Sequence, residues 1–67
     1  MDNNWNKLHA LLTFNRVPFA TFKKNENYVF EIGNNTIKFN DNTFIMNRFY
    51  CKDFNELYDS VDCMIRG

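Results

Sequence analysis

The chain has 67 residues, 45% of them hydrophobic, and eight basic residues balance eight acidic ones, so its formal net charge is zero. This length fits one small domain, which buries roughly 60% of the surface of its unfolded chain and leaves no room for a multi-domain enzyme. The neutral balance gives no overall attraction to nucleic acid. We therefore expect residues 1–67 to form a single domain.

The first element that the sequence predicts is a helix over residues 2–15. Asp2 or Asn3 is suited to cap its start. His9 borders the apolar side of this helix, and Pro18 prevents its continuation because the residue before a proline avoids helical dihedral angles. The apolar side is formed by residues at helical spacing, namely Trp5, Leu8, Leu11 and Leu12.

After Pro18 the apolar period shortens to two, and turn-forming Asn, Asp and Gly residues recur at short intervals as far as Cys51. This pattern is typical of an antiparallel meander. The expected strands are Phe19 to Lys23, Tyr28 to Ile32, Thr36 to Phe39 and Phe44 to Tyr50. Alternation along the second and third strands predicts five core residues, which are Tyr28, Phe30, Ile32, Ile37 and Phe39.

Residues 53–66 form the most strongly specified element. Asp53, with Glu56 three residues later, has the pattern of a capping box. Apolar residues then follow at helical spacing, at Phe54, Leu57, Tyr58, Val61, Met64 and Ile65. The whole chain thus predicts an α+β fold made of a helix, a four-stranded antiparallel meander and a second helix, with both helices on one face of the sheet.

Few residues in the sequence are suited to catalysis or metal binding. Cys51 and Cys63 are too few for a disulfide scaffold, so we interpret both as free thiols. A pair of His9 with either thiol would supply a nucleophile and a base, but neither cysteine stands in a nucleophile motif. Structural zinc needs about four ligands, and a phosphate cradle needs a glycine-rich turn before a helix. We expect no enzyme activity, no cofactor and no metal site.

Composition also points to the source of the chain. Asn, Lys, Phe, Ile, Tyr and Met, which have AT-rich codons, supply 35 of the 67 residues, and this favours a low-GC bacterium or its phages and mobile elements. The start lacks the apolar stretch of a secretion signal, and no apolar run approaches the roughly 18 residues of a membrane helix. We expect a cytoplasmic protein that avoids membranes, located in the host cytoplasm if phage-encoded.

A first candidate binding surface lies on the predicted strand 44–50, where both alternating sets of side chains, one for each face of the sheet, include apolar residues. With the helices on one face, Ile45 and Phe49 would join Val29 in an apolar patch on the open face of the sheet. The alternative is that this patch is covered, either by the first helix or by a second copy of the chain in a homodimer.

A second candidate surface lies on the last predicted helix. The carboxylates of Glu56, Asp59 and Asp62 share the side opposite its apolar arc. A partner rich in Arg or Lys would form charge-assisted contacts with them. The alternative is that this side is only solvated.

These features favour a small non-enzymatic protein-interaction module, such as an inhibitor encoded by a phage or mobile element that binds a host or defence protein. The alternative is a nucleic-acid-binding regulator that uses the basic first third of the chain, which includes Arg16, Lys23 and Lys24. Aromatic residues of the strands, such as Phe30 and Phe49, are the type that stacks on single-stranded bases.

The predicted order of elements resembles that of the double-stranded-RNA-binding domain. That family opens its last helix with a basic cluster, whereas this helix opens with the stretch Lys52-Asp53-Phe54-Asn55-Glu56 and is acidic. A nucleic-acid partner is therefore the less favoured expectation.

Overall fold

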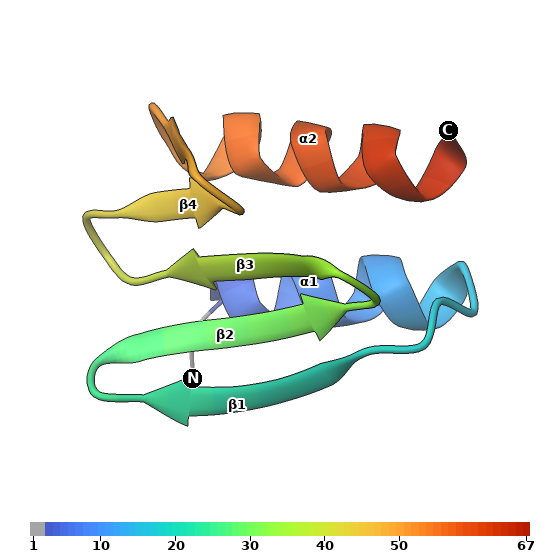
Figure 1. The fold of residues 1–67 in the computed structure, drawn as a ribbon, viewed down its shortest axis with the longest axis horizontal. Coiled ribbons are helices and arrows are strands. Elements are labelled where there is room, and N and C mark those ends of the chain that lie inside the picture. The colour runs from blue at the N-terminus through green and yellow to red at the C-terminus, as the bar shows by residue number, and fades with distance from the viewer. Residues whose placement is uncertain (1–2) are drawn as a thin grey trace.

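The computed structural model describes residues 3–67, which form two helices and one five-stranded sheet (Figure 1). The elements are α1 (Asn3–Phe14), β1 (Ala20–Lys24), β2 (Asn27–Ile32), β3 (Asn35–Phe39), β4 (Phe44–Met46), β5 (Phe49–Cys51) and α2 (Phe54–Arg66). All neighbouring strands are antiparallel and follow in chain order. The α+β fold and the meander are confirmed, with five strands in place of four. The predicted cap at Asp2 lies outside the described residues.

The extra strand arises because the predicted strand 44–50 is a hairpin. Met46 pairs with Phe49 across a two-residue turn, and Asn47 at the start of this turn has a φ of 57°. The backbone N–H of Asn47 donates to the Thr36 carbonyl at 2.7 Å, and its side-chain oxygen accepts from the Thr36 N–H at 2.9 Å. The prediction of one continuous strand was wrong because the polar pair Asn47-Arg48, which stands between the apolar residues of this stretch, forms the turn.

Asparagine and glycine form the other turns as the sequence predicts. In three turns of two residues, the first residue has a positive φ, at Asn25 (57°), Gly33 (59°) and Asn47 (57°). Such left-handed backbone is least costly for glycine and asparagine. In the longer turn between β3 and β4, the Asn40 side-chain oxygen accepts from the N–H groups of Asn42 and Thr43 at 2.7 and 2.8 Å.

The core lies between the sheet and the two helices, which pack on the same face. Phe30 and Phe39 stack at 6.2 Å between ring centroids, and both side chains are fully buried. Trp5 of α1 lies 5.8 Å from Phe30, and Phe54 of α2 lies 6.0 Å from Phe39. Four of the five predicted core residues are buried, whereas Tyr28 is half-buried at the margin of the core. The two helices run in the same direction (Figure 1).

The N-terminal cap of α2 follows the predicted pattern with one difference. The Asp53 side chain accepts from the Glu56 N–H at 2.9 Å, as in a capping box. The Glu56 side chain accepts in return from the N–H of Lys52, at 3.1 Å, rather than from that of Asp53. At the other end, the Gly67 N–H donates to the Cys63 carbonyl at 2.9 Å.

We predict that Asn47→Ala lowers the free energy of unfolding by about 1–3 kcal/mol, since alanine pays about 1 kcal/mol in the left-handed region and lacks side-chain hydrogen bonds worth about 1 kcal/mol each. Asn47→Gly should cost less, because glycine keeps the backbone conformation. Urea denaturation followed by circular dichroism measures both. Asn34→Ala, at the second position of another turn, is the matched control, and an equal loss there would contradict this account.

Candidate functional site

The open face of the sheet differs from the predicted apolar patch. One row crosses all five strands on this face, through Phe22, Val29, Lys38, Ile45 and Tyr50. Val29 is only 3% exposed, and Ile45 is half-buried. The expectation that Phe49 shares this face was wrong, because the turn at Asn47 places it opposite Met46, on the other side of the sheet.

Tyr50 takes the place on the open face that the sequence suggested for Phe49. It lies opposite Ile45 and is 77% exposed, while Phe22 at the far end of the row is 44% exposed. Lys38 lies exposed between them. The open face therefore presents two separated aromatic rings with a cation between them, rather than a continuous apolar patch.

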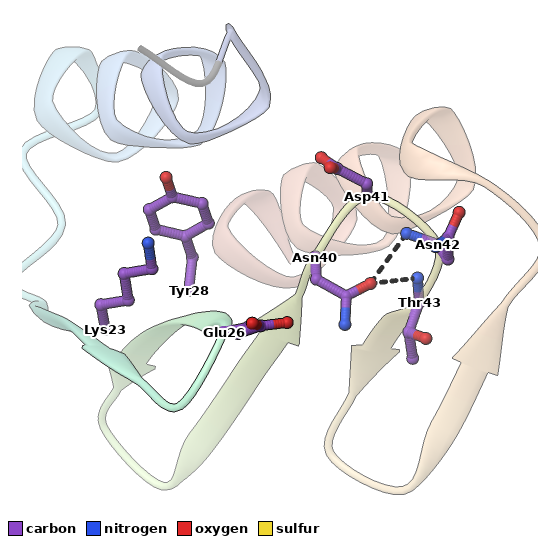
Figure 2. A pocket seen from close by; sticks show the side chains of 7 residues that line it. All are labelled: Lys23, Glu26, Tyr28, Asn40, Asp41, Asn42 and Thr43. Carbon is purple, nitrogen blue, oxygen red and sulfur yellow. Dashed lines mark hydrogen bonds between the residues drawn. The ribbon is translucent and has the colours of Figure 1, made fainter.

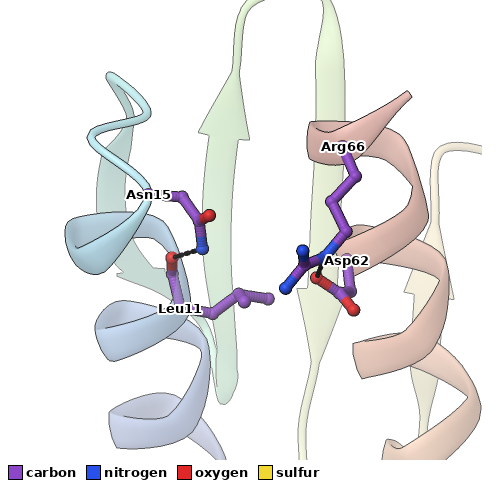
Figure 3. Close-up of polar contacts among 4 residues, drawn as sticks. All are labelled: Leu11, Asn15, Asp62 and Arg66. Carbon is purple, nitrogen blue, oxygen red and sulfur yellow. Dashed lines mark hydrogen bonds and ion pairs between the residues drawn. The ribbon is translucent and has the colours of Figure 1, made fainter.

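The carboxylates of α2 lie on its outer side but are not equivalent. Glu56 is exposed and engaged in the helix cap. Asp62 accepts a hydrogen bond from the Arg66 side chain at 2.6 Å, and the two residues form an ion pair across one turn of the helix (Figure 3). Asp59 is exposed, and its carboxylate takes part in none of the hydrogen bonds or ion pairs of residues 3–67. Asp59 is thus the carboxylate most available to a partner.

A groove that the sequence analysis did not identify runs between the two helices. Its volume is about 590 Å³, and its lining is Lys7, Ala10, Leu11 and Phe14 from α1, Asn15 directly after α1, and Phe54, Asn55 and Tyr58 from α2. Leu11 and Phe54 are each 8% exposed and form the floor, whereas Phe14 is 84% exposed on the rim. The sequence signal for this groove is the second stripe of α1, at residues 7, 10, 11 and 14, which have helical spacing.

Charged side chains lie at both ends of the groove. The ammonium group of Lys7 lies 6.0 Å from the centroid of the Phe54 ring. Toward the other end, Figure 3 shows Leu11 and the Arg66 guanidinium directed into the space between the helices, with Asn15 bonded to the Leu11 carbonyl at 2.8 Å. The groove is therefore apolar along its length and charged at its ends.

A polar hollow of about 470 Å³ lies where the β1–β2 and β3–β4 turns approach each other (Figure 2). Lys23 stands 5.3 Å from the ring centroid of Tyr28 on one side of it. On the other side, Asn40 uses its oxygen within its own turn and donates from its amide to Asn27 at 2.8 Å. The polar groups of Asn40 hold the turns in place.

His9, the candidate catalytic base, is occupied in aromatic packing. The His9 ring stacks on Trp5 at 4.7 Å and meets the edge of Phe19 at 5.4 Å. Cys51 and Cys63 are both free thiols. Residues 3–67 contain no group of three or more His, Cys, Asp or Glu side chains placed to hold a metal ion.

The basic residues of the first third do not form one patch. Arg16 follows the end of α1, whereas Lys23 and Lys24 end β1 at the opposite end of the molecule (Figure 1). The four residue steps of β1 from Ala20 to Lys24 alone span about 13 Å. Phe30, one of the aromatic residues suited to base stacking, is fully buried and cannot stack on a ligand.

Within the described part of the chain, no helix is long and apolar enough to cross a membrane. No known protein family matches the sequence, and neither a curated protein nor a solved structure matches the chain. The surfaces described above therefore carry the functional argument by themselves.

We predict that thiol reagents modify Cys63 before Cys51 in the folded protein. Cys63 is exposed, whereas burial and the neighbouring Glu56 carboxylate raise the pKa of the Cys51 thiol and so reduce its thiolate fraction near neutral pH. The labelling rate of Cys51 should therefore rise at a higher pH than that of an ordinary thiol. Mass spectrometry of Cys51→Ser and Cys63→Ser measures each rate, and equal rates in folded protein would contradict the prediction.

Proposed function

We propose that this protein is a small non-enzymatic protein-binding module whose partner docks in the groove between α1 and α2. The observation that carries the proposal is Phe14, a large aromatic side chain that is 84% exposed beside an apolar floor of Leu11 and Phe54. Exposed aromatic residues next to an apolar hollow are typical of interaction sites.

The role that fits such a module is an inhibitor or adaptor. A domain this small has room for a binding surface but little for an enclosed catalytic pocket. The AT-rich composition supports a phage or mobile element as its source, with a host or defence protein as the partner.

We predict that Phe14→Ser abolishes capture of the partner while leaving the fold intact, because substitution of an exposed side chain changes stability by about 0.5 kcal/mol or less. The matched control is Phe49→Ser, which removes a side chain that is 76% exposed on a different element. Affinity purification from nuclease-treated cells, with the two variants and the original chain compared by mass spectrometry, is the test. A protein retained equally by Phe14→Ser would refute the groove as its docking site.

A second candidate function is binding of single-stranded nucleic acid on the open face of the sheet. The observation that favours it is that Phe22, Lys38 and Tyr50 share one cross-strand row, with both rings and the cation exposed. Aromatic rings that stack bases beside a cation that contacts phosphate are the usual components of such a surface.

For this candidate we predict that an oligo-dT probe binds and that Tyr50→Ala weakens its binding about tenfold, since one stacked base contributes about 1–3 kcal/mol, while Lys38→Ala weakens it mainly at low salt because a phosphate contact is lost. Phe49→Ala is the control, because Phe49 lies on the other side of the sheet. Fluorescence anisotropy at two salt concentrations is the measurement. A probe that fails to bind, or that binds all variants alike, removes this candidate.

A further inference from the structure

We infer that the segment received by the groove between α1 and α2 is an amphipathic helix of the partner, with Lys or Arg along the flank that faces α2. This inference rests on the proposed function, and it adds the conformation and the charge of the bound segment. It follows from the length of the groove, from the helical structure of its two walls and from the charges on its two rims.

The length of the groove sets the number of anchoring side chains. Its lining on α1 extends from Lys7 to Phe14, seven residue steps that rise about 10 Å along the helix. Two turns of a bound helix cover this length and present apolar residues at positions i, i+3 or i+4, and i+7. Because α1 and α2 run in the same direction (Figure 1), a third helix between them would complete a layer by ridge-into-groove packing.

The helical structure of both walls favours a bound helix over an extended peptide. An added strand gains its affinity from main-chain hydrogen bonds to a free sheet edge. The walls of this groove are two helices, whose backbone groups are already bonded within each helix. A bound helix satisfies its own backbone internally and needs only side-chain contacts with Leu11, Phe14 and Phe54.

The charges on the two rims determine which side of the bound helix carries Lys or Arg. The α2 rim carries Asp62, which is paired with Arg66, and the unpaired Asp59 on the outer side of the helix, so these three side chains sum to a charge of −1, whereas the α1 rim carries Lys7. Lys or Arg on the flank facing α2 would reach these carboxylates. Such exposed pairs are worth about 1 kcal/mol or less each, so they select orientation and association rate while the apolar floor supplies affinity.

The same charges disfavour a second copy of this chain as the occupant. The outer side of α2 carries Glu56, Asp59 and Asp62, so a second α2 lying along the rim of this one would bring its carboxylates close to these. A partner with a basic flank avoids this repulsion.

The test uses two designed helical peptides of about 18 residues, long enough to retain helicity. Both carry Leu at i, i+4 and i+7, and one has Lys on a single flank where the other has Glu. Fluorescence anisotropy should show the Lys peptide binding about tenfold tighter than the Glu peptide near 50 mM NaCl, with a smaller ratio near 500 mM because salt screens surface charge. Equal affinity at low salt, or no binding of either peptide, would overturn the inference.

Variants of the protein locate the binding site. Asp59→Lys should weaken the Lys peptide about fivefold at low salt, while Glu26→Lys, the same charge change in the exposed β1–β2 turn, should leave it unchanged. The double exchange Asp62→Arg with Arg66→Asp keeps the net charge and the ion pair, and should have a smaller effect than Asp59→Lys. Phe14→Ser should abolish binding of both peptides. Equal effects of Asp59→Lys and Glu26→Lys would overturn the assignment of the basic flank.

Failure of this inference is distinguishable from failure of the proposed function. If Phe14→Ser loses the cellular partner but neither peptide binds the original chain, the groove binds a protein and the helical occupant is wrong. If Phe14→Ser retains the partner, the proposed function is wrong at its docking site. A dimer in sedimentation that dissociates in Phe14→Ser would show that a second copy occupies the groove, and this result would also overturn the inference.

Discussion

The stacking of Phe30 on Phe39 is the contact on which the rest of the molecule depends. The two rings come from adjacent strands, are fully buried and present one continuous apolar surface to the helices. Trp5 contacts the first ring and Phe54 contacts the second, so each helix is positioned by its own aromatic contact. A chain of 67 residues buries too little surface to maintain separate cores. Loss of either ring would therefore release a helix and the groove wall that it forms.

The groove is a consequence of how the helices divide the sheet. Trp5 places α1 over β2, while α2 packs beside β4 and β5, and Phe54 of α2 also contacts Phe39 at the end of β3. The space between the helices is floored by Leu11 and Phe54 but is not filled. Filling it would need larger side chains near Ala10 and Asn55. The exposed ring of Phe14 marks the same space from the rim, which is why we propose this position for a partner.

Local signals in the sequence predicted the helices and most of the strands well. They could not predict how these elements lie relative to one another. Asp53 and Glu56 are three residues apart, so the cap of α2 follows from sequence alone. The hairpin at Asn47 was missed because apolar residues on both sides conceal a two-residue turn, and this error exchanged Phe49 for Tyr50 on the open face. The groove depends on the distance between helices far apart in the chain, which periodicity cannot encode.

The rim of the proposed binding groove and the core use different residues, and this separation has a functional consequence. Phe14 stands outside the buried cluster, and Asp59 makes no contact that supports the fold. Substitutions at such positions change stability little in a domain with only a few kcal/mol to spare. Leu11 and Phe54 belong to both the core and the groove floor, so they fix the shape of the groove. Substitutions at the rim of the groove can therefore change specificity for a partner, while the floor is constrained by its part in the core.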